Sequence, residues 1–212
     1  MTGAFIVFEG GDGVGKSTQV RLLVDWLRAQ GREVVPTFEP GATVVGAAIR
    51  SILLSKESGE FSPRAEALLY AADKASHVAE VVRPAMSRDA VVVCDRYLDS
   101  MIAYQGAGRV LEIAEVEAIA NWATGALLPG LTILLDLDPA EAMAAITDKD
   151  RLESAGADFH LRVRQHFLEL AARDPQRYLV LPARLPITEL AATIQRRVAA
   201  LLAGEQQNVG GS

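Results

Sequence analysis

The chain has 212 residues, half of them hydrophobic, and carries a formal net charge of −6. This length suits one domain with a substantial core. The negative charge argues against broad nucleic-acid binding, and no apolar run reaches the roughly 18 residues of a membrane span. A single cysteine, Cys94, permits no internal disulfide. We therefore expect a protein of the reducing cytoplasm that binds neither nucleic acid nor a membrane, with Cys94 as a buried strand residue.

Short apolar runs alternate along the chain with longer segments of helical spacing. Strands are predicted at 4–9, 33–37, 90–94, 131–137 and 178–181, and helices at 20–31, 63–86, 111–124, 155–173 and 187–203. Because this alternation is typical of a parallel sheet covered on both faces, we expect a five-stranded α/β fold. No linker divides the chain, so residues 1–204 are predicted to form one domain and 205–212 a disordered tail.

The stretch GGDGVGKSTQ, residues 10–19, lies between the first predicted strand and the first predicted helix. Gly10, four further residues and then Gly15-Lys16-Ser17 match the spacing of the phosphate-binding P-loop. Glycines let successive N–H groups point inward, and the helix start adds unpaired N–H groups. Lys16 can follow a moving phosphoryl group, and the Ser17 hydroxyl can ligate Mg²⁺. A glycine-rich turn that binds nothing is the alternative, but the complete pattern favours a nucleotide-phosphate site.

Ligands of a parallel sheet bind beyond the carboxyl ends of its strands. The second strand leads to Glu39, which is either a site carboxylate or a solvated loop residue, and Arg50 follows it on the next segment. The third strand leads to Asp95, which is either a metal-coordinating acid or a helix cap. Arg96 beside it suits a phosphate because its fork of donors can bind two oxygens.

Aromatic and polar side chains then follow Arg96. Ser100, Tyr104 and Gln105 would place an aromatic wall with hydroxyl and amide groups beside the phosphate, as in a nucleotide pocket. In the predicted helix 63–86, Tyr70 could stack on a base and Lys74 could donate to a base carbonyl. The alternative is that Tyr70 belongs to the core, as aromatic residues on an apolar helix face usually do.

Two further groups of residues have weaker signals. The three histidines show no metal-ligand spacing, and we expect them on helix surfaces: His77, His160 and His166. The segment around 149–164 is dense in charge and is either a solvated helical surface or a mobile lid that brings cations over phosphates. Its cations are Lys149, Arg151, Arg162 and Arg164.

Together these motifs resemble the thymidylate kinase family over nearly the whole chain, roughly Phe5 to Leu202. The landmarks are FEGGDGVGKST, EPGAT…IR, LLYAADKASHV, CDRYLDSMIAYQG, LLDLDPAEA and DRLE…FHLRVRQHFLELA. The P-loop alone indicates only nucleotide binding, whereas the Asp-Arg-Tyr…Ser…Ala-Tyr-Gln stretch is far more specific. The resemblance implies a three-layer P-loop kinase fold with a short lid at about 146–158. It also implies phosphoryl transfer from MgATP to dTMP, giving dTDP and ADP in dTTP synthesis.

Positions within the matched motifs imply individual roles. The ATP phosphates would lie on Gly10, Gly11, Asp12, Gly13, Val14, Gly15, Lys16, Ser17 and Thr18. Mg²⁺ would be held by Ser17 and Asp95. The dTMP site would consist of Glu39, Arg50, Tyr70, Lys74, Arg96, Ser100, Tyr104 and Gln105. Tyr70 would stack on thymine, and Tyr104 would fill the space of a ribose 2′-hydroxyl. Catalysis would rest on Lys16, Asp12, Arg96 and Arg151. An apolar region at 111–128 would supply a homodimer face.

The sequence departs from the family pattern at the substrate sites. Phe38 stands where many bacterial relatives carry an arginine before Glu-Pro-Gly, and Lys74 replaces the arginine that reads the base. Lys74 offers a point charge instead of a planar fork. Pro182-Ala183 stands where Asp-Ala usually follows the last strand, which affects only the adenine site.

A further departure concerns the cation of the lid. The stretch MAAITDK has no arginine ahead of Arg151, and the P-loop has Gly13 where some relatives have an arginine. We therefore expect Arg151 to stabilise the transferring phosphates, with Lys149 as the second candidate.

Two other functions are open at the level of sequence. Lys74 leaves room for a kinase that acts on another nucleoside or nucleotide with the same fold. A P-loop ATPase switch is less favoured, because such a protein needs no acceptor pocket and DRYLDSMIAYQG describes one.

Overall fold

The structure is a computed structural model that describes residues 3–143 and 156–209. Its centre is a parallel sheet in the order β2-β3-β1-β4-β5. The strands are β1 (Phe5–Glu9), β2 (Val34–Phe38), β3 (Val91–Asp95), β4 (Leu131–Asp136) and β5 (Tyr178–Pro182). The five-stranded parallel sheet predicted from the sequence is confirmed.

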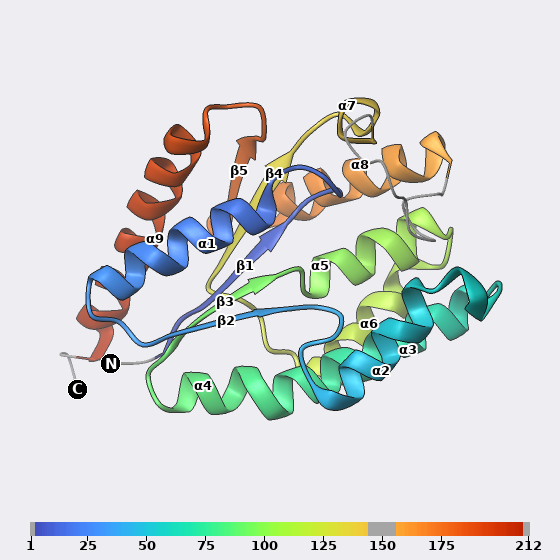
Figure 1. The fold of residues 1–212 in the computed structure, drawn as a ribbon, viewed down its shortest axis with the longest axis horizontal. Coiled ribbons are helices and arrows are strands. Elements are labelled where there is room, and N and C mark those ends of the chain that lie inside the picture. The colour runs from blue at the N-terminus through green and yellow to red at the C-terminus, as the bar shows by residue number, and fades with distance from the viewer. Residues whose placement is uncertain (1–2, 144–155, 210–212) are drawn as a thin grey trace.

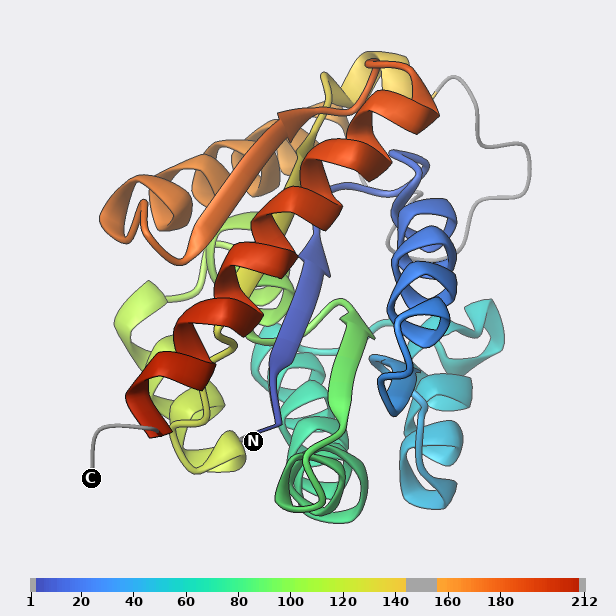
Figure 2. The same ribbon diagram turned by 90° about the vertical axis from the view of Figure 1, so that its left-hand side faces the viewer.

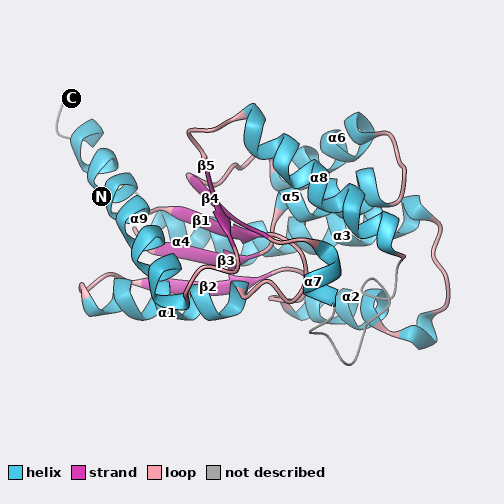
Figure 3. Ribbon diagram, turned by 90° about the horizontal axis from the view of Figure 1, so that it is seen from above, coloured by secondary structure: helices cyan, strands magenta, loops and turns pink. Residues whose placement is uncertain are grey.

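Helices cover both faces of the sheet, which makes three layers (Figures 1 and 3). One face is covered by α1 (Lys16–Ala29) over β2 and β3 and by α9 (Ile187–Val209) over β4 and β5, blue and red in Figure 2. The helices of the other side are α2 (Val44–Leu54), α3 (Pro63–His77), α4 (Arg83–Ser87), α5 (Leu98–Met101), α6 (Ile113–Thr124) and α8 (Ala157–Arg173). Short helical segments complete the chain: η1 (Lys56–Ser58), η2 (Val78–Val82), η3 (Ile102–Gly108) and α7 (Pro139–Met143).

The burial of the strands follows from these layers. Ile6 and Phe8 pack among side chains of α1 and α9, whereas Phe5 and Val7 pack among those of α3, α5 and α8. Because β1, β3 and β4 are covered on both sides, they are continuous apolar runs. Cys94 is buried in β3, as predicted.

Several helix boundaries differ from the predicted ones. The predicted helix 63–86 consists of α3, the π-helical η2 and α4 without a break. The segment after α5 is the π-helical η3, which periodicity did not reveal. α9 continues to Val209 and so enters the segment 205–212, which the sequence predicts to be a disordered tail. Within the described parts of the chain, no helix has the length and apolar character needed to cross a bilayer.

The parallel register brings the strand ends to one edge of the sheet. Asp95 at the end of β3 is level with Phe8 on β1 and with Phe38 on β2. Glu9 is level with Leu134 on β4. The loops that follow β1, β2 and β3 therefore meet at this edge, where the sequence places the chemistry.

Candidate functional site

The loop of residues 10–15 joins β1 to α1 and is shaped by glycine. Gly15, at the N-terminal cap of α1, has a φ of 94°, which an L side chain rarely adopts. A Cβ at Gly10 would collide with the carbonyl oxygen of Leu135 on β4. The loop therefore runs close to the neighbouring strand and delivers the unpaired N–H groups of the first turn of α1 to the sheet edge.

Lys16 is buried and lies across the loop that precedes it. Its Nζ donates to the carbonyl of Gly11 at 2.6 Å and to that of Gly10 at 3.2 Å. Burial, followed by the nearby charge of Arg96, lowers the pKa of Lys16 to about 8. The side chain is still a cation at neutral pH, so the loop encloses a fixed positive charge.

Ser17 and Asp95 connect α1 to the end of β3. The Ser17 hydroxyl donates to Asp95 Oδ2 at 3.0 Å. Mg²⁺ in nucleotide sites usually takes one or two protein oxygens and completes its shell with water and phosphate. A hydroxyl beside a carboxylate fits that requirement. In the described ranges, no cluster of three or more His, Cys, Asp or Glu side chains could cage a metal.

Asp12 is held from two sides by residues that follow β3. Arg96 forms an ion pair with its Oδ1, and the Tyr104 hydroxyl donates to its Oδ2 at 2.9 Å. Burial raises the pKa of Asp12, but the charges of Arg96 and Lys16 outweigh burial and lower it to about 2. Arg96 also donates to the Gly10 carbonyl at 3.0 Å, and its own φ is 68°. This uncommon backbone conformation aims the guanidinium at the P-loop.

Glu9 is a functional residue that the sequence predictions omit. Its Oε1 accepts from the backbone N–H of Tyr97 at 2.9 Å and of Ser100 at 3.1 Å, and its Oε2 accepts from the Ser100 hydroxyl at 2.5 Å. Ser100 Oγ also accepts from Arg96 Nη1 at 3.0 Å. Glu9 thereby fixes the loop that carries Arg96. The sequence could have indicated this role, because Glu9 ends an apolar strand and a carboxylate buried there requires hydrogen-bond partners.

Glu39 and Lys74 form a buried ion pair between the end of β2 and α3. Lys74 Nζ donates to Glu39 Oε2 and to the Tyr97 carbonyl at 2.7 Å. His77 Nδ1 lies 2.6 Å from Glu39 Oε1, and its Nε2 lies 2.7 Å from Thr37 Oγ1. Burial raises the pKa of Glu39, but Lys74 and His77 together hold it below its usual value.

The expectation that the histidines lie on helix surfaces is wrong. His77 is fully buried, and His160 and His166 are buried as well. On α8, both face the side covered by the rest of the molecule, together with Val163 and Phe167. The sequence of α8 already indicated this burial, because its two histidines occur at the same helical spacing as the buried apolar residues.

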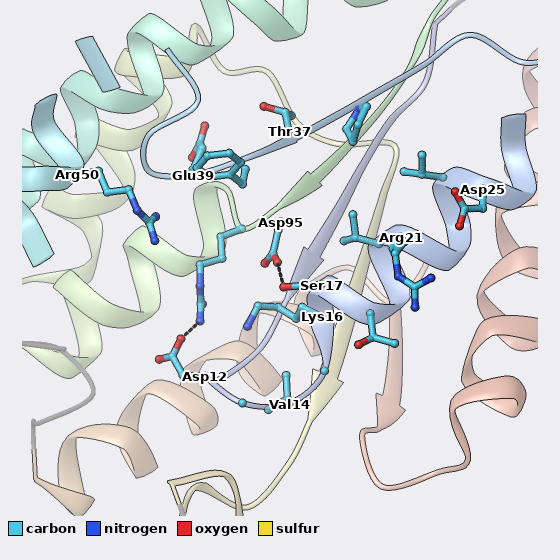
Figure 4. A pocket seen from close by; sticks show the side chains of 18 of the residues that line it. Asp12, Val14, Lys16, Ser17, Arg21, Asp25, Thr37, Glu39, Arg50 and Asp95 are labelled. Atoms are coloured by element: carbon cyan, nitrogen blue, oxygen red, sulfur yellow. Dashed lines mark hydrogen bonds and ion pairs between the residues drawn. The ribbon is translucent and has the colours of Figure 1, made fainter. Parts of the chain in front are cut away.

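A cleft of about 900 Å³ opens beside the P-loop, between α1 and the end of β2 (Figure 4). Figure 4 shows Lys16 between Asp12 and Ser17, and Arg50 extending from α2 toward the same space. Arg50 also donates to the Pro40 carbonyl at 2.8 Å. The predicted residues that line the cleft are Asp12, Gly13, Val14, Gly15, Lys16, Ser17, Thr18, Glu39, Arg50, Asp95 and Arg96.

A smaller cavity of about 180 Å³ lies between α3 and η3. It is lined by the remaining predicted substrate residues, Tyr70, Lys74, Ser100, Tyr104 and Gln105. Asp12, Glu39, Arg50 and Arg96 line both spaces. Gly10 and Gly11, the first residues of the loop, line a separate small cavity together with residues of β4 and α8. The structure thus brings every predicted site residue within its described ranges to one edge of the sheet.

The predicted lid lies mostly outside the described residues, and so do Arg151 and Lys149. The other two cations of that segment dock α8 onto the domain. Arg162 donates to the carbonyls of Ala107 and Gly108. Arg164 binds both oxygens of Asp136 at 2.8 and 2.9 Å, at the end of β4. These two arginines therefore hold the helix in place.

The motifs and the fold have counterparts among known proteins. The family model for thymidylate kinase matches residues 8–194. A thymidylate kinase of Cutibacterium acnes is 59% identical over 202 residues, which cover 95% of this chain and 99% of that protein. The chain belongs to the thymidylate kinase family. Another thymidylate kinase, of Clavibacter michiganensis subsp. michiganensis, is 58% identical over 96% of this chain and 98% of its own. The crystal structure of thymidylate kinase from Ehrlichia chaffeensis aligns with a TM-score of 0.79 at 26% identity, over 94% of this chain and 100% of that one.

Two of the departures from the thymidylate kinase pattern line different parts of the site, Phe38 the larger cleft and Lys74 the smaller cavity. Phe38 is partly exposed, and the Arg50 guanidinium lies 5.8 Å from its ring centre. Lys74 lines the cavity but is 98% buried, with two of its N–H groups bonded to Glu39 and Tyr97. The lysine therefore forms part of the cavity wall. One of its three N–H groups is left to donate to a ligand.

Proposed function

We propose that this chain transfers the γ-phosphoryl group of MgATP to dTMP, giving ADP and dTDP. The observation that carries the proposal is the meeting of two spaces at the P-loop, where Asp12, Glu39, Arg50 and Arg96 line both. A nucleotide in the smaller cavity would present its phosphate to the larger cleft across these residues. An ATPase switch needs no second cavity of this kind, so the arrangement favours a kinase.

The reaction needs little covalent work from the protein. An oxygen of the dTMP phosphate, already ionised near neutral pH, forms a bond to the γ-phosphorus while the bond to the bridging oxygen of ATP breaks. No general base is needed. The protein positions two polyanions and offsets their charge, and Lys16, Arg50 and Arg96 converge for that purpose.

Ser17 and Asp95 are the residues that would hold Mg²⁺. When bound, the ion would supply positive charge beside the phosphate oxygens. The ion pair with Arg96 keeps Asp12 ionised, and the bond to Tyr104 keeps it in place. Asp12 in turn orients Arg96 toward the acceptor phosphate.

Tyr70, Tyr104, Lys74 and Gln105 would surround the thymidine portion of the acceptor. Tyr70 would stack on thymine, and the Tyr104 ring would fill the space of a 2′-hydroxyl. Arg151, or else Lys149, would add a cation as a lid closes over the phosphates. We further propose a cytoplasmic homodimer that uses the apolar region 111–128.

The direct test is a coupled assay with MgATP and a panel of acceptors: dTMP, dUMP, dCMP, AMP and the ribonucleotide of thymine. We expect the highest kcat/KM for dTMP, and a lower value for its ribo-analogue. Preference for another monophosphate would support the alternative that the chain is a kinase for another nucleotide. ATP turnover that is independent of any acceptor would instead indicate a switch.

A further inference from the structure

Glu66, on α3, is outside the predicted site but forms a hydrogen bond with one of its residues. Its Oε1 accepts from Gln105 Nε2 at 3.1 Å. Arg109 donates to both oxygens of the same carboxylate, from Nε at 3.1 Å and from Nη2 at 3.2 Å. Glu66 and Gln105 are each about 1% exposed. The carboxylate is therefore a buried, charge-paired acceptor fixed by a two-point contact.

This contact determines which end of the Gln105 amide faces the smaller cavity, which we call the acceptor cavity. A carboxylate paired with arginine can only accept hydrogen bonds, so Gln105 must turn its NH₂ group toward Glu66. The carbonyl oxygen then lies on the other side. Gln105 lines the acceptor cavity, and among the described residues none donates a hydrogen bond to its Oε1.

We propose that Glu66 is a positioning residue for base selection, because it fixes Gln105 with its acceptor oxygen toward the nucleobase. The inference rests on the proposed function, since it assumes that the base occupies this cavity. Thymine and uracil carry a hydrogen on N3 and can donate to that oxygen. Cytosine has a lone pair on N3, which would face the oxygen unpaired. A buried acceptor left without a donor is costly, so the cavity rejects cytosine.

Gln105 and Arg109 Nε donate to the same atom, Glu66 Oε1. Glu66→Leu removes this acceptor, so the Gln105 amide is free to turn its own NH₂ group to the cavity. A donor in that position suits cytosine N3 and opposes thymine N3–H. Glu66→Gln is the conservative variant, because an amide oxygen in the place of Oε1 still accepts from both residues.

The experiment compares kcat/KM for dTMP and for 5-methyl-dCMP, which share the methyl group, the sugar and the phosphate. We expect Glu66→Leu to lower the dTMP to 5-methyl-dCMP ratio by about tenfold or more relative to wild type. Any discrimination at C4 by Lys74 would be the same in both proteins and would cancel in this comparison.

Two controls separate positioning from folding. Glu66→Gln keeps an acceptor oxygen for Gln105, so it should keep the ratio within about twofold of wild type. Glu115→Gln removes a carboxylate from the exposed Arg64–Glu115 pair and should change neither the ratio nor the stability. A folded Glu66→Leu protein with the wild-type ratio would overturn the proposal, as would an equal loss in Glu66→Gln.

A further variant covers the case in which Glu66→Leu does not fold. Gln105→Leu removes the amide and should lower kcat/KM for dTMP while lowering that for 5-methyl-dCMP much less. An unchanged ratio would contradict the role of the Gln105 oxygen and hence of Glu66. Wild-type turnover of dTMP tests the proposed function independently of all these ratios.

Discussion

Lys16 illustrates how the P-loop prepares a charge before a substrate arrives. Its ammonium group is bonded to two loop carbonyls, and phosphate oxygens would compete for the same group. In Lys16→Ala we expect kcat to fall by about 10²–10³ without loss of the fold. Steady-state kinetics and circular dichroism measure the two properties. Arg88→Ala is the matched control, because it removes a cation paired with Glu33 away from both cavities. Near-normal kcat in folded Lys16→Ala would exclude this role.

Glu9 gives a pH dependence whose sign follows from its burial. Burial, together with the charge of Asp99, raises the pKa of Glu9 from 4.5 to about 7. Between these values the folded state holds a proton that the unfolded state has lost. The free energy of unfolding therefore falls as the pH rises from about 5 to 7.

Glu9→Gln should remove this loss, because the amide does not titrate. Urea unfolding measures this effect. Between pH 5 and pH 8, the free energy of unfolding of the variant should rise relative to that of the wild type by up to about 3 kcal/mol. Parallel stability curves for the two proteins would show that Glu9 is ionised throughout.

The sequence predicted individual residues well where their geometry is local. Lys16 and Ser17 follow a fixed spacing from Gly10 within one loop, so their placement needed no knowledge of tertiary packing. The partners of Glu39 could not be predicted in this way, since Lys74 and His77 lie 35 and 38 positions away. Only the packing of α3 against the end of β2 makes this buried group, and it explains why His77 is not at the surface.

At the scale of elements, strands were easier to predict than the segment η3. β1, β3 and β4 are mostly apolar because helices cover both sides of the sheet, and this leaves a clear pattern. In η3 the π-helical turn shifts Tyr104 and Gln105 relative to an α-helix, and no residue type marks that shift. The two side chains reach the cavity because α8 packs on η3, and Gly108 permits the approach.

Gly108 provides the test of this packing. A Cβ there would lie 2.5 Å from Phe159 Cε2, and the Phe159 ring itself packs against Tyr104 with 5.9 Å between ring centres. We expect Gly108→Ala to lower the free energy of unfolding by about 1–3 kcal/mol and to raise KM for dTMP through Tyr104. Gly156→Ala, at the start of α8, is the control because a Cβ there meets nothing within 4 Å. Equal stability of the two variants would contradict tight packing at Gly108.

At the scale of the whole molecule, two large apolar side chains of one region are exposed to solvent. Trp122 on α6 is 84% exposed, and Leu128, a few residues further on, is 50% exposed. Both lie within the region 111–128, which the sequence predicts to be a dimer face. Indole rings are concentrated in protein interfaces because they bury a large apolar area in a fixed orientation. α6 packs against α3, α5 and η3, and the exposed Trp122 is available for contact with a second copy.

We therefore expect the wild type to sediment as a dimer and Trp122→Glu to sediment as a monomer at micromolar concentrations, since a buried, unpaired charge would oppose association by several kcal/mol. Ile187→Glu is the matched control, because Ile187 is 58% exposed on the first turn of α9, on the opposite face of the sheet. It should remain dimeric. The emission of Trp122 should also shift to shorter wavelength as the wild type is concentrated, because association removes the indole from water. If both variants and the wild type sediment alike as monomers, the apolar face of α6 serves another purpose. If Ile187→Glu alone dissociates, the interface lies on α9.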